Sequence, residues 1–155
     1  MEVKTLELAS SNSMAISLEM IRNGEAGLNQ HRRNLLSRVP QIGDWVALPL
    51  ESVSDHDVAY VSAAVCHEFA LLRGREKDIL LHGEPYRCIF DDALIDLLKT
   101  KKFRLIIHSH PDYGIVTASR EDRQFLKTIN QKSSRIISFI TGEVSEFKDD
   151  LFEDL

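Results

Sequence analysis

The feature that most constrains the fold of this chain is a short apolar run that ends in two histidines and a proline. Residues 103–107 form the nearly unbroken apolar run typical of a buried strand, and His108, Ser109, His110 and Pro111 follow directly. Side chains alternate along a strand, so His108 and His110 leave it on the same face. Pro111 lacks a backbone donor and turns the chain out of the sheet. The pattern predicts two imidazoles side by side at the point where a strand becomes a loop.

A third candidate ligand lies on the helix predicted next along the chain. One stripe at helical spacing contains Ser119, Asp122, Phe125, Leu126 and Ile129. On this apolar stripe, Asp122 points inward, toward the sheet. Two histidines and one carboxylate form a three-ligand zinc set with a fourth position left for water, which is typical of catalytic zinc. We therefore expect one zinc ion per chain, bound by His108, His110 and Asp122.

The order His-x-His-Pro followed by Ser-x-x-Asp resembles the JAMM (MPN, JAB-domain) family of zinc metalloproteases. The resemblance implies that His108, His110 and Asp122 bind zinc. It also implies that Ser119 helps to stabilise the oxyanion, and that a glutamate from an earlier strand acts as general acid and base. Eight residues separate His110 from Ser119, one more than we expect of the family, and a loop absorbs such an insertion readily. The resemblance covers residues 56–142.

Glu68 is the candidate for that glutamate. It stands in the run 65–72, which is apolar on both faces except for His67 and Glu68. A lone carboxylate inside an apolar strand is costly, because burial disfavours its charged form. In the JAMM family the glutamate likewise starts a strand that ends in a glycine turn, and residues 68–74 look like that segment. The structural alternative places Glu68 at the wet end of the strand, paired with an arginine.

The same residues also have plainer interpretations. Ser119 followed by Asp122 at the third helical position is what an ordinary capped helix start looks like. Two histidines on one strand face often only form local hydrogen bonds. Three other histidines, His56, His67 and His82, fall outside the pattern and are expected on the surface or in the core.

Predicted strands and helices alternate along the chain, which indicates an α/β fold with a small mixed sheet flanked by helices. A capping signal at residues 54–57 precedes a short helix over 58–65 that leads into a strand. Strands over 79–82 and 86–90 and a helix after Asp91 precede the histidine strand, and residues 134–140 form a return strand. The JAMM resemblance implies a cytidine-deaminase-like layering of these elements.

The chain is expected to form one domain in three parts. Residues 1–50 form a helical N-terminal segment, with one helix after the serine cluster at 10–13 and a second over 25–38; an irregular crossing follows over 41–54. Residues 51–142 form the JAMM-like metalloprotease core. Residues 143–155 form an acidic tail with six acids and one lysine, which is either a docked amphipathic helix or a segment used by a partner.

The composition of the chain limits the kinds of binding partner that we expect. The net charge of −5 and the pI near 5.7 argue against nucleic acid as the main partner. No apolar run approaches the roughly 20 residues that span a bilayer, and the N-terminus lacks a signal pattern, so we expect a cytoplasmic protein without a membrane partner. Cys66 and Cys88 lack metal-site spacing and are expected to be small buried residues. The sequence does not predict an oligomeric state.

The function expected from these features is a zinc-dependent metallopeptidase that hydrolyses a peptide or isopeptide bond in a protein or peptide substrate. The C-terminal tail of a ubiquitin-like protein is the substrate that the resemblance suggests. Two alternatives stay open: a non-catalytic binding or scaffold module with the same fold, and a RadC-like role beside DNA, which shares the His-x-His-Pro loop.

Overall fold

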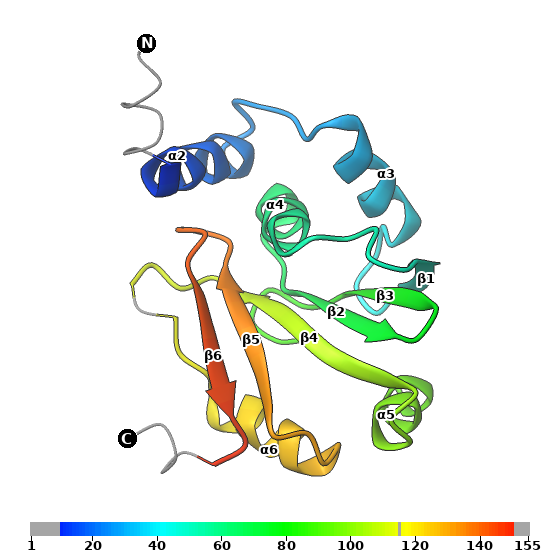
Figure 1. Ribbon diagram of the computed structural model, residues 1–155. Helices are drawn as coiled ribbons and strands as arrows, with labels where there is room; N and C mark the ends of the chain where they lie inside the picture. The colour runs from blue at the N-terminus through cyan, green and yellow to red at the C-terminus, as the bar shows by residue number, and fades with distance from the viewer. Residues whose placement is uncertain (1–9, 115, 151–155) are drawn as a thin grey trace.

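Six strands form one mixed sheet in the order β1-β3-β2-β4-β5-β6 (Figure 1). The structure is a computed structural model that describes residues 10–114 and 116–150. The strands are β1 (Trp45–Pro49), β2 (Phe69–Gly74), β3 (Lys77–His82), β4 (Phe103–His110), β5 (Ser133–Ser138) and β6 (Val144–Lys148). Strands β4 and β5 pair in parallel, and the other neighbours pair antiparallel.

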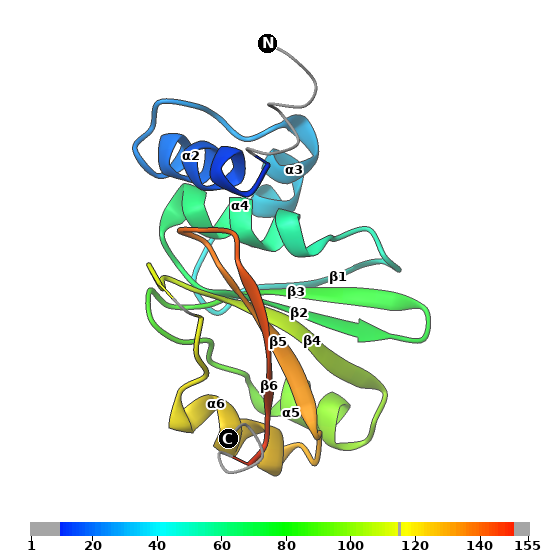
Figure 2. The same ribbon diagram turned by 60° about the vertical axis from the view of Figure 1, so that its left-hand side comes forward.

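Within the described ranges, five helices lie on the two faces of this sheet (Figure 2). One face carries α2 (Ser10–Arg22), α3 (Gln30–Arg38) and α4 (Asp55–Val65); the other carries α5 (Asp92–Lys99) and α6 (Arg120–Thr128). Side chains alternate along the strands between two cores. On β2, Phe69 and Leu71 join the core under the first group of helices, whereas Ala70 and Leu72 join the core with α5 and α6. The expected α/β fold, with a mixed sheet and an N-terminal helix, is confirmed.

A bulge in β4 decides which face receives the histidines. The pairing of β2 with β4 passes from Leu105 directly to Ile107, so Ile106 is an extra residue on β4. A bulge bends the strand and re-aims the side chains that follow it. His108 therefore lies on the same side as Leu105, the side covered by α5 and α6, and the two residues line one cavity.

The N-terminal caps of the helices follow from local sequence patterns. Ser54 caps α4 in a capping box with Asp57, and Asp91 caps α5 by accepting from the backbone N–H of Leu94. The expected helix over 25–38 begins later, at Gln30, because Asn29 provides the cap. No helix in the described ranges is long and apolar enough to cross a membrane.

The edges of the sheet differ from the sequence-based expectations. Strand β1 lies inside the segment expected to be irregular, and β6 lies inside the acidic tail, where a docked helix or a partner segment was expected. Residues 151–155 of that tail lie outside the described residues. Residues 86–90, expected as a strand, are irregular. Short edge strands depend on pairing with distant neighbours, here β3 and β5, which a local pattern does not reveal.

The two cysteines are also less buried than expected. Cys66 is exposed at the end of α4, where it adopts the left-handed conformation with φ of 58°. Such a helix end is stabilised by the backbone geometry of its cap and not by burial. Cys88 is half-buried and lines the cavity next to the histidines.

Candidate metal centre

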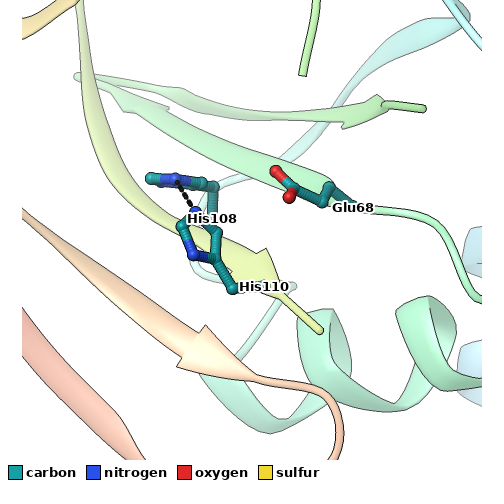
Figure 3. A group of neighbouring side chains, drawn as sticks. All are labelled: Glu68, His108 and His110. Atoms are coloured by element: carbon teal, nitrogen blue, oxygen red, sulfur yellow. Dashed lines mark hydrogen bonds between the residues drawn. The ribbon is translucent and has the colours of Figure 1, made fainter. Parts of the chain in front are cut away.

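The two histidines of β4 lie at its carboxyl end, where the strand leaves the sheet. His108 and His110 are both buried, and their Nε2 atoms are 3.0 Å apart (Figure 3). Their side-by-side placement confirms the geometry expected from the alternation of side chains along a strand. Two imidazoles in this position cannot both present a proton to each other, so other groups must complete the arrangement.

Asp122 completes it from the first turn of α6. Ser119 is the N-cap of that helix: its Oγ accepts from the Asp122 N–H at 3.0 Å, and the Asp122 carboxylate accepts from the Ser119 N–H at 2.9 Å. The same carboxylate places Oδ1 3.1 Å from Nε2 of His108 and Oδ2 3.1 Å from Nε2 of His110. The capping box therefore holds Asp122 in the position that brings its carboxylate to both rings.

The spacing of these donor atoms suits a metal ion. Around a tetrahedral zinc ion with bonds of 2.0–2.1 Å, neighbouring ligand atoms are roughly 3.3 Å apart. The two Nε2 atoms are 3.0 Å apart, and each lies 3.1 Å from a different oxygen of the Asp122 carboxylate. Two imidazoles and a carboxylate are also donors that zinc prefers. The donor types and these short separations are therefore compatible with a bound metal ion.

Glu68 faces the histidine pair from the start of β2. The strand begins at Phe69, so Glu68 directly precedes it and does not stand inside it as expected. Its side chain is 3% exposed, which excludes a wet strand end, and it points toward the two rings (Figure 3). Ligand atoms of Glu68, His108 and His110 all lie within 4.8 Å of one another, so this buried group could hold a metal ion.

The pKa values of these buried groups are shifted in different directions. Burial raises the pKa of Glu68 to about 8, helped by Asp122 and Asp112 and opposed by His110. Burial lowers the pKa of His108, and it would lower that of His110; the hydrogen bond with Asp122 and three nearby carboxylates instead raise the pKa of His110 to about 9. The Asp122 pKa, which burial alone would raise, is held well below its usual range by its two histidine partners. The acids around His110 therefore favour a positive charge at this point of the centre.

Asp112 is a residue that the sequence analysis missed. Its Oδ2 lies 3.3 Å from Nδ1 of His110, so that the imidazole donates there and leaves Nε2 as the ligand atom. Histidines that bind metals commonly donate their other ring nitrogen to a carboxylate in this way. The backbone carbonyl of Asp112 accepts from the Ser138 hydroxyl at 2.6 Å, which fixes the loop. No spacing rule in the sequence marks this residue.

A chain of buried hydroxyl groups ties the histidine strand to the start of β2. The Phe69 N–H donates to Ser109 Oγ at 2.8 Å, Ser109 Oγ lies 2.6 Å from Ser62 Oγ, and Ser62 Oγ lies 2.7 Å from the Val58 carbonyl oxygen. Because a carbonyl only accepts, Ser62 donates to Val58 and Ser109 donates to Ser62. Ser109 thereby holds Phe69, and the adjoining Glu68, next to the histidine pair.

These residues open into one cavity of about 570 Å³. Ser119, which is exposed, lies on its wall together with Glu68, His108, His110 and Asp122. The irregular segment 86–90 also lines this cavity. Gly83 sets the path of that segment, because a Cβ there would lie 2.7 Å from the Glu68 carbonyl oxygen and 2.9 Å from the Cys88 sulfur. All five residues expected at the site therefore meet at one cavity.

Comparisons with protein-family models, with curated proteins and with solved structures found no match for this chain. The site is thus described from its own geometry.

Proposed function

We propose that this protein is a zinc-dependent metallopeptidase that hydrolyses a peptide or isopeptide bond. The observation that carries the proposal is the buried Glu68 carboxyl group facing two histidine Nε2 atoms that are 3.0 Å apart and that both contact the Asp122 carboxylate. Burial raises the pKa of Glu68 to about 8 in the metal-free protein, and a bound cation would lower it toward neutral pH, where one carboxyl group can both accept and donate a proton. The resemblance to the JAMM family supports the same assignment of roles.

In this proposal His108, His110 and Asp122 hold the zinc ion, with Asp112 orienting His110. Zinc in such a site acidifies water and polarises a carbonyl group. Glu68 accepts the proton of the attacking water and passes it to the leaving nitrogen. The hydroxyl of Ser119 accepts from its helix as a cap, so its own proton stays available to donate to an oxyanion in the cavity. The tail of a ubiquitin-like protein is one candidate substrate.

The test is Glu68→Gln, which keeps size and removes the charge. Elemental analysis and turnover on quenched peptides and a tail-extended ubiquitin-like protein are measured on one preparation. We expect one zinc per chain and turnover lower by about 10²–10⁴-fold, the usual range for a general acid–base. Glu76→Gln, in the exposed turn between β2 and β3, is the matched control and should retain turnover. Unimpaired turnover in a zinc-loaded Glu68→Gln protein would exclude the proposal.

A second function is favoured by the position of Glu68, which has a ligand atom within 4.8 Å of a ring nitrogen of each histidine. If Glu68 joined the other three residues as a ligand, four protein groups would close the coordination sphere, which is typical of structural zinc. The protein would then be a non-catalytic binding module. In that case Glu68→Gln would weaken zinc binding and lower the melting temperature together, whereas the catalytic assignment predicts normal zinc content.

A further inference from the structure

An aromatic wall begins directly at the candidate metal ligands. Phe147 of β6 stands edge-to-face against His108, with ring centroids 5.7 Å apart. Phe125 lies one turn after Asp122 on α6, so the same helix face carries the carboxylate and an aromatic ring. Phe90 stacks on Phe125 with centroids 4.4 Å apart. The cavity therefore has one polar side, with the candidate ligands, and one apolar side.

Part of this apolar surface is open to solvent. Phe90 and Phe125 are half-buried, Ile89 is 48% exposed and Tyr86 is 83% exposed, and all four line the same cavity. Large apolar side chains in water gain free energy when a ligand covers them. The lining also includes Arg87, which is exposed next to Tyr86, so a ligand that covers the aromatic rings meets hydrocarbon beside one cation. A pocket of this kind is a typical small-molecule or side-chain site.

We propose that the substrate carries a bulky apolar side chain, leucine- or phenylalanine-like, next to the bond that is cleaved. The inference rests on the proposed function, because the metal centre places the reacting carbonyl. A substrate side chain next to that carbonyl group would then contact the aromatic rings of Phe90, Phe125 and Phe147, which we call the aromatic wall. A main chain with glycine at this position would leave the wall uncovered.

The size of the cavity supports the same conclusion. Its volume of about 570 Å³ falls within the roughly 300–1,000 Å³ of pockets that enclose whole ligands. A backbone without side chains occupies only a part of that space. Acidic side chains are disfavoured for a further reason, since four acids line the cavity, Glu68, Asp112, Glu121 and Asp122, against one arginine, Arg87. The expected order of preference is therefore phenylalanine or leucine, then glycine, then aspartate.

The first experiment measures binding without catalysis. Hydroxamates of phenylalanine, leucine, glycine and aspartate all bind zinc through the same group and differ only in the side chain. Differences between their dissociation constants on the zinc-loaded protein therefore measure how strongly the aromatic wall binds each side chain. We expect the phenylalanine and leucine compounds to bind at least about tenfold more tightly than the glycine compound, the lower end of what a hydrophobic pocket discriminates. Equal affinities, or a preference for glycine, would overturn the inference.

Substitutions of single aromatic residues test which side chains cause the preference for apolar ligands. Phe90→Ala, in the irregular segment, should reduce the phenylalanine-to-glycine ratio several-fold with zinc content unchanged. Phe125→Leu is the second variant, because it keeps the apolar contact with α6 and removes the ring. Phe103→Ala is the matched control: Phe103 is a half-buried ring packed against the same core at the other end of β4, outside the cavity lining. A ratio that Phe103→Ala lowers as much as Phe90→Ala does would contradict the assignment.

Cleavage assays separate this inference from the proposed function. Paired peptides with phenylalanine or glycine–glycine before the scissile bond are compared on the zinc-loaded protein. Cleavage of the glycine–glycine peptide alone would leave the peptidase function standing and overturn the apolar preference. A hydroxamate preference without cleavage of any peptide would exclude the peptidase function and support the apolar pocket. Selective cleavage of the phenylalanine peptide supports both.

Discussion

Two histidine pairs lie at the same end of the sheet, and they differ in what surrounds them. In one pair, Nε2 of His108 is 3.0 Å from Nε2 of His110. In the other, Nδ1 of His67 is 2.7 Å from Nε2 of His82. Judged by the distance between ring nitrogens alone, the second pair is the closer one. The sequence expectation nevertheless placed ligands in the first pair and ordinary histidines in the second.

The second pair is satisfied by neutral chemistry. Nδ1 of His82 donates to the Val39 carbonyl oxygen at 2.7 Å, so its Nε2 accepts and His67 donates. The His82 ring also stacks on Phe69, with centroids 4.4 Å apart. No carboxylate in the described residues is recorded as a hydrogen-bond partner of this pair. These hydrogen bonds and the ring stacking are made by two neutral imidazoles and need no metal ion.

The first pair is surrounded by carboxylates. Asp122 reaches both Nε2 atoms, Asp112 reaches Nδ1 of His110, and Glu68 lies opposite. The comparison teaches that the spacing of two histidines does not define a candidate metal centre. The acids supplied by the following loop and helix, and by the start of β2, do so.

The largest expected effect is the loss of zinc from one pair and not from the other. His108→Ala removes one of three ligands and should lower zinc content from one per chain to a small fraction. His82→Ala should retain zinc, although it leaves the Val39 carbonyl without its partner and costs about 1–3 kcal/mol of stability. Elemental analysis and melting temperature on both variants separate binding from stability. Zinc loss in both variants, or in neither, would contradict the comparison.

A smaller effect is expected from the carboxylate behind His110. Asp112→Asn keeps an acceptor for Nδ1 but removes the charge, and such changes lower metal affinity by roughly 10–100-fold. The zinc dissociation constant, measured by competition with a chelator, reports this loss. Asp91→Asn is the matched control, because Asp91 caps α5 and accepts from Trp45 away from the cavity lining. An unchanged affinity in Asp112→Asn would mean that Asp112 only fixes the loop.

How much of the site the sequence predicts follows from how local each signal is. The apolar run before His108 and the Ser119–Asp122 cap are contiguous patterns, and both predict the observed local structure. The cap also illustrates that the plainer interpretation and the functional one are compatible, since the capping carboxylate is the one that reaches the histidines. Glu68 is found because an acid among apolar residues has few structural explanations.

The features that the sequence does not predict depend on distant pairing. The bulge at Ile106 decides which face His108 occupies, and it arises from the register with β2. Strands β1 and β6 form through β3 and β5, and residues 86–90 leave the sheet although their composition favours a strand. That last departure has a functional consequence, because the irregular segment provides one wall of the cavity.

The smallest effect is a change in where each pair holds its protons, and it has opposite signs in the two pairs. In the metal-free protein, Asp122 and its neighbouring acids raise the pKa of His110 to about 9, against the effect of burial. Burial, aided by His67, lowers the pKa of His82, and the Val39 carbonyl only partly offsets it. Imidazole NMR shifts in chelator-treated protein should show His110 protonated at about pH 7.5 and His82 neutral there.

The consequences for stability follow from these directions. A raised pKa means that the folded state binds the proton more tightly, so the His110 contribution is fully present below about pH 6.5 and is lost as the pH rises to about 9. For His82 the unfolded chain binds the proton more tightly, so stability is lost as the pH falls below about 6.5. Urea unfolding of the metal-free protein across this range should show that His110→Gln reduces the alkaline loss, leaving the part due to Glu68, whose pKa is raised to about 8, and that His82→Gln removes the acid loss. The same pH dependence in both variants would mean that the carboxylates do not distinguish the pairs.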